Sequence, residues 1–208
     1  MRERQAATIV LVILCVSLAS CSQQSESLRS AVQTGGFASP DDLLEHVQSI
    51  LSDTPPRITE FFALVHCENE LEQFYDSLSR DLFIPMGELN QVWHERFGEL
   101  FMPAAAKILP HQSMQLANVD GTRASVNCLT AEGESHILKL VQVADQWLIS
   151  AATWLPEDKS AIPSVEDRRV HAEFASSFAD RIRRFTERIR AGEFESAEEA
   201  NAAYESHT

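Results

Sequence analysis

The sequence predicts an α+β domain in which helices come first, an antiparallel sheet follows and a long amphipathic helix comes last. Apolar residues recur at spacings of three and four from Leu43 to Phe101, which is typical of amphipathic helices. They alternate with polar residues between Met114 and Leu155, and this indicates strands. The helical period returns from Val170 to Ile189. A chain of 208 residues, 44% hydrophobic and 23% charged, suits one domain with a core of ordinary size.

The first twenty residues have the pattern of an export signal. Arg2 and Arg4 precede an uncharged apolar run from Ala6 to Leu18, and small residues and a cysteine follow. The run is too short for a lasting transmembrane helix, which needs roughly twenty residues. We therefore expect residues 1–20 to be a signal peptide that is removed.

The end of this signal, Leu18-Ala19-Ser20-Cys21, resembles the lipobox of bacterial lipoproteins. The resemblance implies cleavage between Ser20 and Cys21, a diacylglyceryl group on the Cys21 thiol, and a further acyl chain such as palmitate on the new amino terminus. Several acyl chains hold a protein on a membrane far better than one. The alternative is a plain secretory signal followed by a chance cysteine.

The resemblance also implies an address in the cell envelope. Ser22 follows the anchor, and in enterobacteria-like sorting a serine there directs a lipoprotein to the outer membrane. We expect a lipid-anchored protein on the outer membrane facing the periplasm if the source has two membranes. With one membrane, the expected place is the outer face of the plasma membrane.

Residues 21–36 are predicted to be a lipidated flexible tether, because they are rich in serine and glutamine and end in Gly35-Gly36. Ser39 is then placed to cap a helix whose first turn holds Pro40, Asp41 and Asp42. Pro55-Pro56 should end this helix. Further helical stripes are expected from Ile58 to Val65, from Leu71 to Leu78 and, after a break at Pro85 and Gly87, from Leu89 to Phe101.

The second half of the domain is predicted to be a four-stranded antiparallel meander. Asp120-Gly121 is a strong tight-turn signal between the first two strands. The strands are expected at Met114–Val119, Ala124–Cys128, Ile137–Val143 and Trp147–Leu155. The domain would span residues 37–156. A helical extension over residues 164–204 would follow, with a long helix that Gly192 ends and a short helix capped by Ser196 and Glu199.

This order of elements resembles the nuclear-transport-factor-like, or cystatin-like cone, superfamily between Phe37 and Leu155. The best local matches are Val119-Asp120-Gly121 and Asp145-Gln146-Trp147-Leu148-Ile149. The resemblance implies a curved sheet that wraps the helices into a cone whose mouth often holds a small ligand. A few members place acid–base residues inside the cone. Fold alone does not transfer a function.

Two cysteines stay free once Cys15 is removed with the signal and Cys21 is lipidated. Outside the cytoplasm Cys67 and Cys128 can form a disulfide, which would close a loop of about sixty residues and add about 4 kcal/mol on the loop-entropy model. The alternative is two buried thiols that never meet. The sequence leaves both open.

Charge and missing motifs exclude several function classes. The net charge of −14 disfavours binding to nucleic acid. His94-Glu95 lacks the second histidine of a zinc-protease helix, because Gly98 stands in its place. There is no phosphate loop, dinucleotide glycine pattern, serine elbow or paired Cys-x-x-Cys. We therefore expect no metal and no cofactor.

Candidate pocket residues are His66, Glu68, Tyr75 and His94, which lie on or beside the helical stripes that would line a cone. A histidine near a carboxylate can act as a base. The plainer reading is that both histidines are surface or core residues and that Tyr75 is packing. No catalytic residue is assigned.

The apolar face from Val170 to Ile189 must be buried, either on the cone or in a homodimer with another copy. The sequence favours a membrane-anchored, non-catalytic envelope domain that binds a small molecule or a protein. The alternative is an envelope enzyme that uses a cone pocket for proton transfer or hydrolysis.

Overall fold

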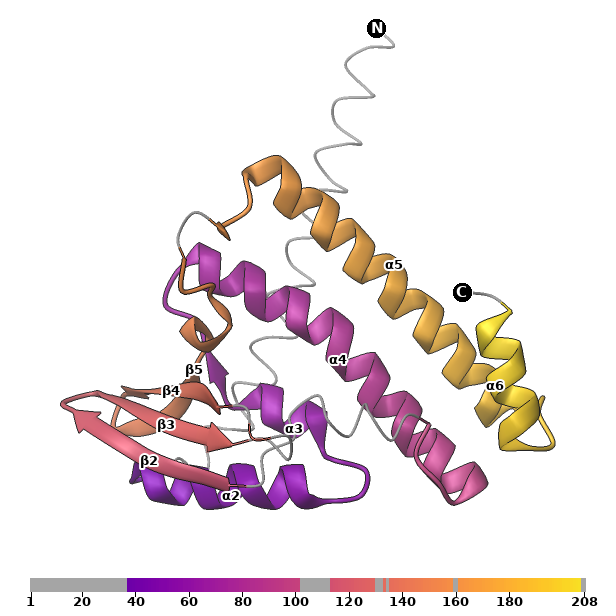
Figure 1. Ribbon diagram of the computed structural model, residues 1–208, viewed down its shortest axis with the longest axis horizontal. Helices are drawn as coiled ribbons and strands as arrows, with labels where there is room; N and C mark the ends of the chain where they lie inside the picture. The colour runs from indigo at the N-terminus through magenta and orange to yellow at the C-terminus, as the bar shows by residue number, and fades with distance from the viewer. Residues whose placement is uncertain (1–36, 102–112, 130–132, 134, 159–160, 207–208) are drawn as a thin grey trace, which may run out of the picture. The chain divides into compact units, whose positions relative to one another are not determined.

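The computed structural model describes residues 37–101, 113–129, 133, 135–158 and 161–206. The contacts within the chain divide it into two units, residues 1–36 and Phe37–Thr208. The predicted signal, lipobox and tether lie outside the described residues. The elements run in the order α2 Pro40–Ser52, α3 Ile58–Ala63, β1 Val65–His66, α4 Glu70–Phe97, β2 Ser113–Asp120, β3 Arg123–Leu129, β4 Ser135–Val143, β5 Gln146–Ser150, η2 Ala151–Trp154, α5 Val165–Arg190 and α6 Ala197–Glu205 (Figure 1).

The α+β class is confirmed, but the sheet differs from the predicted one. Its strands lie in the order β1-β5-β4-β3-β2, and β2 to β5 form the expected antiparallel meander. The added strand β1 pairs parallel with β5, with Val65 opposite Ile149 and His66 opposite Ser150. The prediction of four antiparallel strands was therefore wrong: among the described residues the sheet has five strands and is mixed. A strand of two residues is too short to show an alternation of apolar and polar residues, so the sequence predicts a helical stripe as far as Val65 instead.

The last predicted strand is also shorter than expected. β5 ends at Ser150, and residues Ala151–Trp154 form a 3₁₀ turn in which the amide of Ala152 donates to Ser150 Oγ at 3.3 Å. The turn before β5 lies at Ala144-Asp145, where both residues have positive φ. β2 and β3 are joined at Gly121, which also has positive φ, as the Asp120-Gly121 signal predicts.

Side-chain caps begin α2, α4, α5 and α6. Ser39 Oγ accepts the amide of Asp42 at 3.1 Å, and Ser196 Oγ accepts that of Glu199 at 3.2 Å, as predicted. Asn69 begins α4 in the same way through the amide of Glu72. The Glu72 carboxylate in turn accepts the amide of Glu68 at 2.8 Å and is almost fully buried.

α4 is one helix of 28 residues that continues through Pro85, so the predicted break there was wrong. A proline inside a helix removes one hydrogen bond, and packing on both sides of α4 offsets this loss. Gly87 lies two residues further along α4, next to Ile58 of α3. A Cβ at Gly87 would lie 3.0 Å from Ile58 Cβ, so glycine permits this close approach.

The second half of α4 packs against α5 and α6 around a core of its own. Trp93 is fully buried, and its ring lies 4.8 Å from that of Phe97 and 4.7 Å from that of Phe101. Ile182 of α5 is also fully buried there, and the Phe185 ring lies 5.2 Å from that of Tyr204 in α6. The C-terminal helix therefore packs on the body of the same chain.

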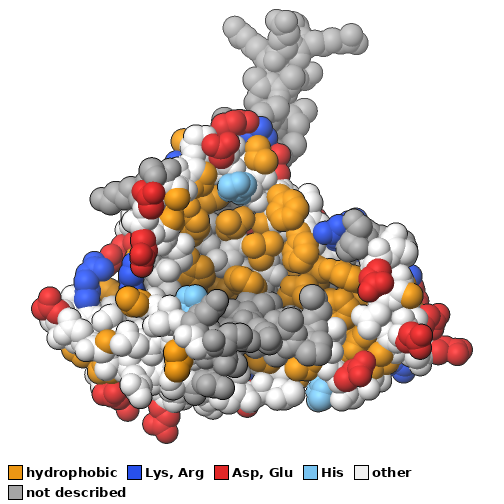
Figure 2. Space-filling view, viewed as in Figure 1, with side chains coloured by type: hydrophobic (Ala, Val, Ile, Leu, Met, Phe, Trp, Pro, Cys, Tyr) orange, Lys and Arg blue, Asp and Glu red, His pale blue; other side chains and the backbone are white. Residues whose placement is uncertain are grey.

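The N-terminal part of α5 lies beside α4 but beyond α6 (Figure 1). Hydrophobic side chains gather on the surface over the region of α4 and α5 (Figure 2). Within the described part of the chain, no helix is both long and apolar enough to span a bilayer.

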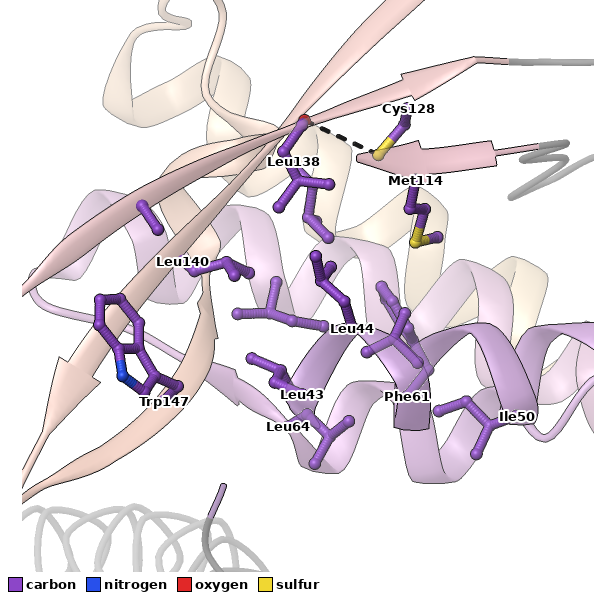
Figure 3. Packing of buried hydrophobic residues seen from close by; sticks show 14 of the residues in the cluster. Leu43, Leu44, Ile50, Phe61, Leu64, Met114, Cys128, Leu138, Leu140 and Trp147 are labelled. Carbon is purple, nitrogen blue, oxygen red and sulfur yellow. Dashed lines mark hydrogen bonds between the residues drawn. The ribbon is translucent and has the colours of Figure 1, made fainter. Parts of the chain in front are cut away.

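The other core joins α2 and α3 to one face of the sheet (Figure 3). Leu43 and Leu44 of α2 lie toward Leu138 and Leu140 of β4 in that view. Phe37 extends the arrangement, because its carbonyl accepts the amide of Trp147 at 3.0 Å. α4 thus connects two cores, and its outer surfaces and ends carry the candidate site residues.

Candidate functional site

The four predicted pocket residues are not brought together. His66 lies in β1, Glu68 lies just before α4, and Tyr75 lies in its second turn, whereas His94 lies near the other end of the helix. Nineteen positions separate Tyr75 from His94, which is about 28 Å along a helix axis. Two separate regions therefore take the place of the single predicted pocket.

At the first end of α4, Glu68 forms an ion pair. Arg123 Nη2 donates to both Glu68 oxygens, at 2.9 and 2.8 Å, and this hydrogen bonding raises the pKa of Arg123. Both side chains are partly exposed, so the pair contributes about 0–1 kcal/mol. Tyr75 packs edge-on against Phe74 at 5.2 Å. These contacts indicate structural roles for Glu68 and Tyr75.

A more buried polar cluster lies close by, and the sequence reasoning missed it. Arg80 Nε donates to Asp76 Oδ2 at 2.6 Å, and Arg80 Nη2 donates to the Phe62 carbonyl at 2.6 Å. Asp76 is only 9% exposed, and its Oδ1 has no hydrogen bond of ordinary geometry among the described residues. The spacing of Asp76 and Arg80, i and i+4 on one helix, was the available signal.

The thiol of Cys67 lies beside this carboxyl group. Burial, and then the negative charge of Asp76, raise the pKa of Cys67 to about 12. Burial also raises the pKa of Asp76, against the opposing effect of Arg80. Because the thiolate is the nucleophile in cysteine chemistry, a thiol held in its protonated form is a poor catalyst at neutral pH.

Cys67 and Cys128 are free thiols in the structure, so the disulfide alternative is not the one it adopts. Cys128 is 1% exposed within the α2–α3–sheet core, and burial raises its pKa. Its Sγ lies 3.9 Å from the Val126 carbonyl oxygen (Figure 3). Cys128 therefore behaves as a core residue.

At the other end, His94 lines a cavity of about 310 Å³ between α4 and the chain that leads into α3. One wall is residues 55–60, which include Pro55, Pro56 and Ile58. The other wall is a single face of α4, whose members recur at helical spacing. That face consists of Gly87, Glu88, Gln91, His94 and Glu95.

The charges around this cavity are mostly negative. Glu60, Glu88 and Glu95 contribute three carboxylates, against one guanidinium from Arg57. Arg57 is already paired with Glu60 and with Asp53, the latter at 2.6 Å. The cavity therefore favours a positively charged ligand.

His94 adds a polar group with an unmet hydrogen-bonding capacity. Its Nδ1 is buried and has no partner among the described residues. Gln91 Nε2 donates to Glu95 Oε1 at 3.1 Å, while the Glu88 carboxylate accepts no hydrogen bond from another described residue. A ligand cation in the cavity would therefore pair with the Glu88 carboxylate first.

The arrangement offers binding groups rather than a recognisable catalytic set. In the part of the chain that the structure describes, no hydrogen bond joins His94 to a carboxylate, and no three His, Cys, Asp or Glu side chains are grouped to hold a metal ion. Comparison with protein-family models, with curated proteins and with solved structures gives no match. The geometry of the cavity is therefore the basis for a functional proposal.

Proposed function

We propose that this protein is a lipid-anchored cell-envelope protein whose folded domain binds a small organic cation without transforming it. The observation that carries the binding proposal is the α3–α4 cavity. It is lined by three carboxylates, one already paired guanidinium and the His94 side chain. All three glutamates are solvent-exposed, so their pairing with a ligand cation gives orientation more than affinity.

The expected ligand is small. A volume of about 310 Å³ lies at the lower end of the roughly 300–1,000 Å³ typical of small-molecule sites. Pro55, Pro56 and Ile58 offer an apolar wall, so a short hydrocarbon portion next to the charged group would be covered. Glu60 is half-exposed, and binding should weaken as salt screens the carboxylates.

Binding is tested with the full chain extracted in a neutral detergent. Native mass spectrometry records any bound mass, and calorimetry then measures choline, putrescine and arginine as cationic probes. We expect Glu88→Gln to weaken binding of the best probe severalfold. Glu99→Gln makes the same change just beyond α4, outside the cavity lining, and should leave binding unchanged. Equal binding by both variants, or binding of none of the probes, would refute the cationic-ligand proposal.

The anchor rests on the lipobox Leu18-Ala19-Ser20-Cys21 and has its own test. Cells that express the chain are grown with labelled palmitate, and the label is followed in wild type and in Cys21→Ser. We expect the label and the membrane association of the mature chain to be lost together in the variant. Retained label in Cys21→Ser would contradict the lipoprotein proposal without affecting the binding proposal.

The alternative, an envelope enzyme using acid–base chemistry, is favoured by one observation. His94 and carboxylates line the same cavity, which are the residue types needed for proton transfer or hydrolysis. His94→Gln distinguishes the two functions, because an amide side chain can form hydrogen bonds but cannot act as an acid or base near neutral pH. Loss of turnover with binding retained would establish the enzyme.

A further inference from the structure

α5 presents apolar side chains to solvent on its N-terminal half. Val165, Val170 and Phe174 are 75%, 50% and 64% exposed. Isolated apolar residues on a surface are ordinary, but Val170 and Phe174 lie one turn apart on one helix and are both exposed. Val170 and Phe174 therefore mark a surface that the described chain leaves uncovered.

The opposite side of α5 has its partners in the same chain. Ala175, Ala179 and Ile182 are fully buried along α4. Further along, α6 and the chain before it cover Phe185, whose ring lies 5.7 Å from that of Phe194. Figure 1 shows α6 beside the C-terminal part of α5 only. Val165, Val170 and Phe174 thus lie on the part of α5 that α6 does not contact.

These residues belong to a stripe that continues along the helix. Asp167, Val170, Phe174, Ser177, Arg181 and Arg184 follow one another at alternating spacings of three and four. Such spacing places side chains along one seam of a helix, as in paired helices. Each of the six is exposed or half-buried, so the seam faces outward.

The charges of α5 are divided between its halves. Val165–Ser177 has three acidic and two basic side chains, whereas Phe178–Arg190 has two acidic and five basic ones. The formal charges are therefore −1 and +3. Two such helices attract when they run antiparallel, because the acidic half of each lies against the basic half of the other. A two-fold symmetric pair requires this kind of self-complementary surface.

Two arginines on the seam have capacity for an added partner. Arg181 lies 5.6 Å from the centroid of the Phe178 ring and forms no ion pair with another described residue. Arg184 forms no ion pair with another described residue. In an antiparallel pair with the axis between Phe174 and Ser177, Asp167 of one copy faces Arg184 of the other, and Val170 faces the stem of Arg181.

We propose that the occupant of this surface is a second copy of this chain, with the two α5 helices antiparallel and Phe174 near the two-fold axis. An anionic lipid surface fits less well, because Glu166, Asp167 and Glu173 lie beside the same apolar residues. The dimer uses none of the cavity residues, so it stands independently of the proposed binding function.

The first test uses cross-linking of the full chain in its membrane. Ser177→Cys places a thiol next to the axis, whereas Ser176→Cys places one about 100° away around the helix. Both positions are exposed. A short bismaleimide should cross-link Ser177→Cys to a dimer and leave Ser176→Cys at the wild-type level. Equal cross-linking of the two variants would refute the antiparallel arrangement.

The second test measures mass by sedimentation equilibrium of the detergent-extracted full chain. Phe174→Glu should raise the dimer dissociation constant by at least about tenfold, since a central aromatic residue dominates such contacts. Ala172→Glu adds the same charge at an exposed position about 200° away and should leave the constant unchanged. A monomeric wild type would overturn the proposal. A dissociation constant that Phe174→Glu leaves unchanged would overturn it as well.

Discussion

Shortening Ile182 to alanine tests whether α5 is an integral part of the domain. Ile182 is fully buried between α5 and the second half of α4, in the core that contains Trp93. The substitution removes three buried carbons, worth about 0.8 kcal/mol each, or about 2.4 kcal/mol in all. The remaining cavity adds to this, so we expect a loss of about 3–4 kcal/mol and a fall in Tm of about 6–16 °C.

The assay is urea unfolding followed by circular dichroism and by tryptophan fluorescence. Trp93 reports on the α4–α5–α6 core and Trp147 on the α2–α3–sheet core. Val165→Ala removes two carbons from a side chain that is 75% exposed on the same helix and should change stability by less than about 0.5 kcal/mol. A loss below about 1 kcal/mol for Ile182→Ala would refute the packing argument. A separate early transition for the helical signal would show that α5 folds independently of the sheet.

Three further predictions concern the polar cluster and the α3–α4 contact. With its pKa raised to about 12, Cys67 should react slowly with iodoacetamide at pH 8. Asp76→Asn should speed the reaction, because it removes a nearby negative charge. Peptide mass spectrometry measures the rate, and an equal rate in wild type and variant would contradict the prediction. Because folding raises the pKa of Asp76 above 3.8, the folded protein holds that proton more tightly than the unfolded chain does. The stability of wild type relative to Asp76→Asn should therefore fall as the pH rises above about 4. Urea unfolding at several pH values measures this difference, and a rise with pH would contradict the prediction. Gly87→Val should destabilise by about 1–3 kcal/mol because Ile58 leaves no room, and a wild-type melting temperature would show that α3 can shift freely.

Local sequence signals predicted most of the helices and strands. Ser39 and Ser196 begin helices where their spacing from acidic residues indicates, and Gly121 lies in the turn between β2 and β3. In each case the hydrogen bonds or the backbone conformation involve residues within a few positions of one another. Signals of this kind are readable without knowing the rest of the fold.

The errors come from places where distant packing decides the structure. Pro85 ordinarily ends or bends a helix, but α4 continues because its two halves pack against different partners. β1 exists because Val65 and His66 meet β5 more than eighty positions away, and two residues carry no period. The number of strands therefore could not be predicted from the pattern alone.

The candidate site was predicted only in part. His94 does line a cavity, but the other three proposed residues lie at the far end of α4 or beside it. The opposing wall, Pro55 to Glu60, comes from a segment whose contact with Gly87 has no local signature. The Asp76–Arg80 pair, by contrast, was visible as an i, i+4 pair.

The contacts of β5 imply that the α2–α3 region cannot complete its packing before β5 is available. Phe37 pairs with Trp147, and β1 pairs with Ile149 and Ser150, so both ends of the α2–α3 region depend on a strand about 85 to 110 positions later. Loops of this length close slowly, because their entropy is lost before the contacts form. A chain that crosses a membrane from its N-terminus would expose Leu43 and Phe61 until β5 has emerged. Such exposed apolar side chains make an incompletely folded domain prone to aggregation.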